Sequence, residues 1–130
     1  MKTIKVNRNI RKSIEMAEEQ IMNGYEVVFD FGTSKDFEKV EKMLTYLGDD
    51  YGVDIYIRHA ELKEIIEGGI IGGVAGAGIG IIAAFYFSGP VGWIALSGML
   101  IGAAAGSISK SLIVTVYKRK GVTYMKVKTA

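Results

Sequence analysis

The sequence predicts an α+β membrane protein, in which a small mixed-sheet cytosolic domain of βαβαβ…ββ order is interrupted by a two-helix transmembrane hairpin. Three observations predict this class. The forty-two residues from Gly68 to Ser109 contain no charged side chain, Ser88-Gly89-Pro90 break that run near its middle, and alternating apolar residues flank it on both sides. A helix needs about 20 apolar residues to cross about 30 Å of hydrocarbon, so the run is long enough for two crossings.

The residues before the run alternate between strand and helix patterns. Apolar and polar side chains alternate in three segments, while two segments between them repeat apolar residues at helical spacing and end at Gly24 and Gly48. Thr33 and Asp36 are spaced as a capping box at the start of the second helix. A βαβαβ order implies parallel strands with right-handed crossovers. Strands are predicted at residues 2–6, 25–31 and 53–58, and helices at residues 10–24 and 33–48.

The uncharged run predicts two helices, Glu61 to Phe87 and Val91 to Ser111, joined by a turn at residues 88–90. The domain boundaries are therefore a cytosolic βαβαβ part at 1–60, the hairpin at 61–111 and a completing β-hairpin at 112–130. Lys and Arg flank the outer helix ends and are absent from the turn, which places both termini in the cytoplasm. The aromatic residues that mark the far membrane interface are Phe85, Tyr86, Phe87 and Trp93.

Glycine gives both predicted helices smooth faces. Twelve of the seventeen glycines lie in the uncharged run, and many recur every four residues, on one face of a helix. Two outcomes are compatible with this spacing: the two helices pack against each other within one monomer, or copies of the chain associate. A third interpretation makes the run the buried core of a soluble fold. The packing residues are Gly68, Gly69, Gly72, Gly73, Gly76, Gly80, Gly98, Gly102 and Gly106.

The residues after the run predict two further strands, at residues 112–117 and 122–128, joined by a basic turn. Two strands alone are marginal in water, so they are expected to join the N-terminal sheet and make it five-stranded. Residues 1–67 carry ten basic and fourteen acidic side chains, whereas residues 110–130 carry six basic and no acidic ones. The two parts therefore complement each other in charge, or the basic tail lies on anionic lipid.

Little in the sequence indicates catalysis. The chain has no cysteine and one histidine, His59, for which a hinge or surface role is expected. Residues 78–83 match a GxGxxA dinucleotide pattern, but no strand precedes them. The loop 32–34 offers N–H groups to an anion, although neighbouring Asp30 and Asp36 favour ordinary capping. We therefore expect no enzyme activity, no cofactor, no metal site and no nucleic-acid binding.

The pattern predicts a self-associating integral membrane protein whose partner is the lipid bilayer, as in a membrane-permeabilising or pore-forming toxin. Homo-oligomers would place Glu64, Glu67 and Lys110 at the pore mouth. The alternative is a membrane-anchored scaffold, whose small α/β domain binds a protein partner. An enzyme or small-molecule sensor is the third class, and it lacks a recognisable motif.

Overall fold

A computed structural model describes residues 2–5, 10–61, 70–71, 74–75, 80–84 and 90–129, with side chains described over 14–61 and 92–129. In chain order the elements are β1 (Lys2–Lys5), α1 (Ile10–Met22), β2 (Glu26–Asp30), α2 (Asp36–Tyr51), β3 (Asp54–His59), β4 (Ile70–Ile71), β5 (Val74–Ala75), β6 (Gly80–Ala84), α4 (Pro90–Ala105), β7 (Ser111–Arg119) and β8 (Val122–Thr129). The elements before residue 60, and the last two strands, lie close to their predicted bounds.

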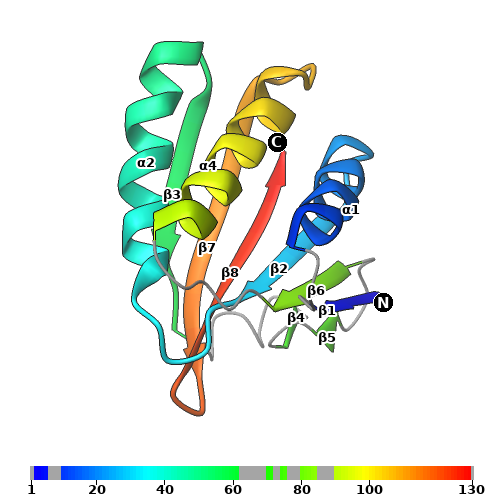
Figure 1. Ribbon diagram of the computed structural model, residues 1–130, viewed down its shortest axis with the longest axis vertical. Helices are drawn as coiled ribbons and strands as arrows, with labels where there is room; N and C mark the ends of the chain where they lie inside the picture. Colours follow the sequence, from blue (N-terminus) through cyan, green and yellow to red (C-terminus); the bar gives the residue numbers. More distant parts are fainter. Residues whose placement is uncertain are drawn as a thin grey trace.

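The strands β2, β8, β7 and β3 form a mixed sheet, and β6 and β1 extend it to six strands in the order β1-β6-β2-β8-β7-β3 (Figure 1). Within these described strands, β8 alone runs opposite to the rest: it pairs antiparallel with β2 and β7, and the other pairs are parallel. The C-terminal hairpin therefore lies between β2 and β3. β4 and β5 pair separately.

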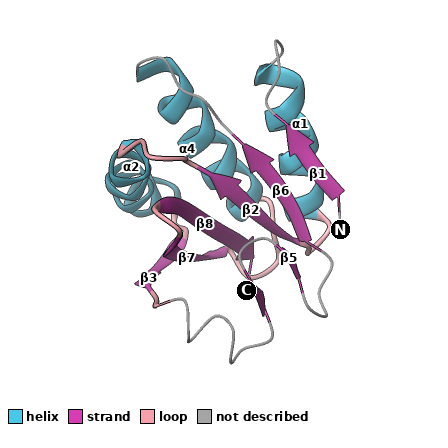
Figure 2. Ribbon diagram, turned by 90° about the horizontal axis from the view of Figure 1, so that it is seen from below, coloured by secondary structure: helices cyan, strands magenta, loops and turns pink. Residues whose placement is uncertain are grey.

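The three described helices lie side by side on one face of this sheet (Figure 2). The crossovers from β1 to β2, from β2 to β3 and from β6 to β7 all advance in the same direction across the sheet. Crossovers between parallel strands share one hand, so crossovers that advance in the same direction put their helices on the same face. α4 is the middle helix and contacts both α2 and α1.

The hydrophobic core lies between the sheet and this helix layer. Alternate residues of the central strands, such as Val27 and Phe29 in β2, face the helices and are fully buried. α4 contributes Leu96 and Leu100, both 0% exposed. Burial of one such side chain contributes about 1.5–3 kcal/mol, so α4 is a principal element of the core.

The predicted transmembrane hairpin is wrong. Residues 80–84, inside the first predicted helix, form β6, and the second predicted helix is the 16-residue α4. No helix in the part of the chain that the structure describes is long and apolar enough to cross a bilayer. The fold is a small α+β arrangement with a mixed sheet. The predicted membrane location with two cytoplasmic termini and the predicted transmembrane glycine-zipper hairpin are therefore wrong.

Two interior elements account for much of the uncharged run. β6 pairs with β1 on one edge and with β2 on the other, and interior parallel strands are typically continuous apolar segments. α4 has the sheet beneath it and a helix on each flank. Hydropathy alone does not separate a short buried strand or core helix from part of a spanning helix. The third interpretation of the run, a buried core, describes α4 correctly.

Candidate functional site

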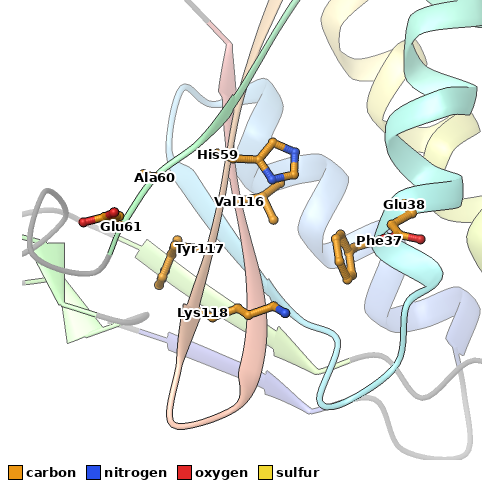
Figure 3. A pocket seen from close by; sticks show the side chains of 8 residues that line it. All are labelled: Phe37, Glu38, His59, Ala60, Glu61, Val116, Tyr117 and Lys118. Carbon is orange, nitrogen blue, oxygen red and sulfur yellow. The ribbon is translucent and has the colours of Figure 1, made fainter.

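A cavity of about 500 Å³ lies at the carboxyl ends of β3 and β7, against the first turn of α2. We call it the strand-end pocket. Ligand pockets commonly have volumes of about 300–1,000 Å³, so it is large enough for a small organic molecule. Its lining residues are Phe37, Glu38, His59, Ala60, Glu61, Val116, Tyr117 and Lys118 (Figure 3).

The strand register brings its side chains together. His59 in β3 is the partner of Val116 in β7, and Lys118 follows two residues later on the same face of the sheet. This is the face that the helices cover. Phe37, 8% exposed, forms the opposite wall from α2 and meets Phe31 edge to face at 6.3 Å between ring centroids. The pocket therefore joins two basic side chains to an apolar wall.

Glu41 holds the imidazole of His59 from the α2 side. Its Oε1 lies 2.5 Å from His59 Nε2, and the side chain of Glu41 is 16% exposed whereas that of His59 is 62% exposed. This contact is an ion pair only when the histidine is protonated. His59 is thus an exposed side chain at the pocket wall that contacts a carboxylate from another element.

The loop before α2 satisfies its own N–H groups. The Gly32 N–H donates to Asp30 Oδ1 at 2.8 Å, and the Ser34 N–H donates to the Phe31 carbonyl at 3.0 Å. The Asp36 N–H donates to Ser34 Oγ at 3.1 Å, while the N-cap residue of α2 is Lys35, which makes no side-chain cap hydrogen bond, so the predicted capping box at Thr33 and Asp36 is not formed. These bonds favour the capping interpretation of the loop over an anion site.

Two tyrosines pack on the other face of the sheet. The rings of Tyr117 and Tyr124 stack with centroids 5.5 Å apart. Burial raises the pKa of Tyr124 above its usual value of 10.0, the negative charge of Asp30 raises it further, and Arg119 opposes both effects.

A second hollow, the α2–α4 groove, has a volume of about 390 Å³ and no charged lining residue. Gly98 and Gly102 form part of it on the outer side of α4, and both are exposed. A Cβ atom added to either glycine would meet no atom within 4 Å, apart from the helix's own backbone. The lining residues are Met43, Leu47, Tyr51, Ile94, Gly98, Ile101, Gly102 and Ala105.

The predicted site residues are dispersed. Trp93, expected at a membrane interface, is half-buried beside the core, with Lys39 Nζ 5.9 Å from its ring centroid. Gly80 lies in β6, Gly106 directly follows α4, and Lys110 is exposed between α4 and β7. The remaining predicted residues lie outside the described part of the chain: Gly68, Gly69, Gly72, Gly73, Gly76, Phe85, Tyr86, Phe87, Glu64 and Glu67.

Sequence reasoning missed the strand-end pocket because its members are far apart in the chain. The alternation that places Val116 and Lys118 on one face was readable, but the parallel pairing that brings His59 beside them was not. Comparison of the chain with protein-family models, with curated proteins and with solved structures found no match.

Proposed function

We propose that the protein is a self-associating interaction module, in which two copies pack through their helix layers with α4 against α4. The observation that carries the proposal is the exposed, uncharged α2–α4 groove, whose floor includes Gly98 and Gly102. The proposal keeps the self-association predicted from the glycine spacing and assigns it to a face of the helix layer.

The outer side of α4 differs from an ordinary exposed helix face. Its sequence, PVGWIALSGMLIGAAA, has no charged residue, although Ala95, Gly98 and Gly102 are exposed and Ile94 is 44% exposed. Exposed helix faces normally carry polar side chains, and a contiguous apolar patch is typical of an interaction surface. Glycines four residues apart also allow a second backbone to approach closely.

The charges on α2 favour a second copy in antiparallel orientation. Exposed Lys39 and Lys42 lie in the first half of α2, and exposed Asp49 and Asp50 lie near its end. A twofold axis that sets α4 against α4 in opposite directions also sets α2 against α2 in opposite directions. In that arrangement Lys42 of each α2 faces the Asp49–Asp50 end of the other, although the first half of the helix also carries the acidic residues Asp36, Glu38 and Glu41. A parallel arrangement would lack this complementarity.

Charge reversal tests the arrangement. Lys42→Glu and Asp49→Lys each replace an attraction with a repulsion, whereas the double variant restores opposite charges across the interface. An exposed ion pair contributes about 0.2–1 kcal/mol, and the twofold axis makes each pair occur twice in the dimer. Loss of both copies should therefore weaken dimerisation by about twofold to thirtyfold. The dimer dissociation constant is measured by sedimentation equilibrium at low salt.

If the double variant dimerises as tightly as the wild type, the single variants were weakened by loss of the pair between Lys42 and Asp49 and not by a change in net charge. If the double variant dimerises more weakly than both single variants, the antiparallel arrangement is refuted. Binding of a different protein partner, the alternative from the sequence, instead predicts a monomer of 14.1 kDa at every concentration. That result would refute self-association itself.

A further inference from the structure

We propose that the strand-end pocket binds a small organic anion, in which a carboxylate or phosphate group is attached to a flat apolar body. This site is separate from the α2–α4 groove, because the two share no lining residue. Its occupancy therefore does not depend on self-association.

The basic groups of the pocket point inward and its acidic groups do not. The His59 ring and the Lys118 amine extend toward the space in front of Phe37 (Figure 3). The Glu61 side chain lies away from that space, and the Glu38 carboxylate lies beyond the Phe37 ring as seen from His59. An anionic group between His59 and Lys118 would accept charge-assisted hydrogen bonds from both.

The remaining wall suits an apolar body. The Phe37 ring closes the space on the α2 side, and the buried Val116 side chain lies beside His59 in the sheet. A flat ring attached to the anion would pack against both. The start of α2 also favours an anion, but Asp36 and Glu38 in its first turn offset that effect. Recognition of the anion therefore depends on the two basic side chains.

Glu41 links anion binding to protonation of His59. With Nε2 against the Glu41 carboxylate, only a protonated imidazole can also donate from Nδ1 to the ligand. An anionic ligand between His59 and Lys118 therefore favours the protonated imidazole. The other charged groups near His59 are Glu38 on α2, Lys118 on β7, Arg58 on β3 and Glu61, which follows β3.

The test is a titration of the ¹⁵N-labelled full chain, followed by amide chemical shifts, with three probes of similar shape: benzoate, phenyl phosphate and the neutral benzamide. Benzoate or phenyl phosphate should shift the amides of Phe37, His59, Val116 and Lys118, and benzamide should bind at least tenfold more weakly. The tighter of the two anions identifies the preferred acidic group. Equal binding of benzamide, or shifts confined to other parts of the sheet, would overturn the proposal.

Substitution of the two basic residues tests whether they bind the anion. Lys118→Gln should weaken binding of the preferred anion about tenfold, because one charge-assisted hydrogen bond is lost. Lys126→Gln is the matched control: Lys126 pairs with Thr115 on the opposite face of the same sheet, so its loss should leave affinity unchanged. His59→Gln should also weaken binding of the preferred anion, because the variant cannot donate a charge-assisted hydrogen bond from this position. Equal weakening by both lysine variants, or an unchanged affinity in His59→Gln, would refute the assignment.

Discussion

Replacement of a helical glycine by alanine should lower the stability of the fold at Gly48 and raise it at Gly98. In Gly48→Ala, the new Cβ would lie 2.6 Å from Ile55 Cγ1 and 2.9 Å from the Val53 carbonyl oxygen, both closer than side chains normally approach. The Val53 N–H donates to the Gly48 carbonyl at 2.9 Å, which ties the end of α2 to the start of β3. In Gly98→Ala, nothing outside the helix backbone lies within 4 Å of the new Cβ.

The expected free energies follow from these distances. Overpacking costs about 1–3 kcal/mol, and replacing a helical glycine with alanine contributes about 1 kcal/mol of stability. Gly48→Ala should therefore lower the free energy of unfolding by about 1 kcal/mol, and Gly98→Ala should raise it by about 1 kcal/mol. The free energies of unfolding of the two variants should therefore differ by about 2 kcal/mol.

The assay is guanidinium denaturation at low micromolar concentration, followed by far-ultraviolet circular dichroism, so that dimerisation contributes little to either value. The wild type and both variants are compared with a common slope against denaturant. Destabilisation by Gly98→Ala would show that the outer face of α4 is covered within one chain, which would refute the groove. Stabilisation by Gly48→Ala would refute the close contact between α2 and β3.

Two further predictions concern the core and the face of the sheet opposite the helices. Leu100→Ala should lower the free energy of unfolding by about 2–5 kcal/mol because Leu100 is 0% exposed, while Ile94→Ala, on the same helix and 44% exposed, should cost less than about 1 kcal/mol. Equal small costs in denaturation experiments would show that α4 does not pack on the sheet. The raised pKa of Tyr124 means that folding favours the neutral phenol. The contribution of this effect to the free energy of unfolding is fully present below the unfolded pKa of about 10, and it is lost as the pH rises through the folded pKa. Tyr124→Phe should therefore lose less stability than the wild type between pH 8 and pH 10.5. Tyr46→Phe is the control because Tyr46 is 66% exposed, and an identical loss in both variants would contradict the cause given.

The sequence predicted the elements whose patterns are local. Alternation gave β2, β3, β7 and β8, and helical spacing with glycine ends gave α1 and α2. The prediction failed at β6, which was predicted as part of a helix, and at the role of α4, which is a helix as predicted but packs in the core instead of crossing a membrane. Interior elements lack the polar side chains that reveal a periodic pattern. The short pairing of β6 between β1 and β2 depends on residues far apart in the chain, and hydropathy carries no information about that pairing.

The two candidate sites also differ in how far the sequence predicts them. Gly98 and Gly102 were singled out for their spacing, and they do share an exposed side of α4, although the partner helix predicted for them is not part of the described fold. Lys118 and Glu41 were not singled out. Their relation to His59 arises from the parallel pairing of β3 with β7 and from the packing of α2, and neither follows from the order of residues alone.

The most direct test of the account is the mass of the protein in solution as a function of concentration, compared between the wild type and Gly102→Leu. The mass of the wild type should rise from 14.1 kDa toward twice that value, while Gly102→Leu should remain near 14.1 kDa. The new Cβ meets no atom within 4 Å outside the helix backbone, and the leucine side chain would extend from the groove into the space that the second copy needs. A wild type that stays at 14.1 kDa, or a variant that associates equally well, would contradict self-association through α4.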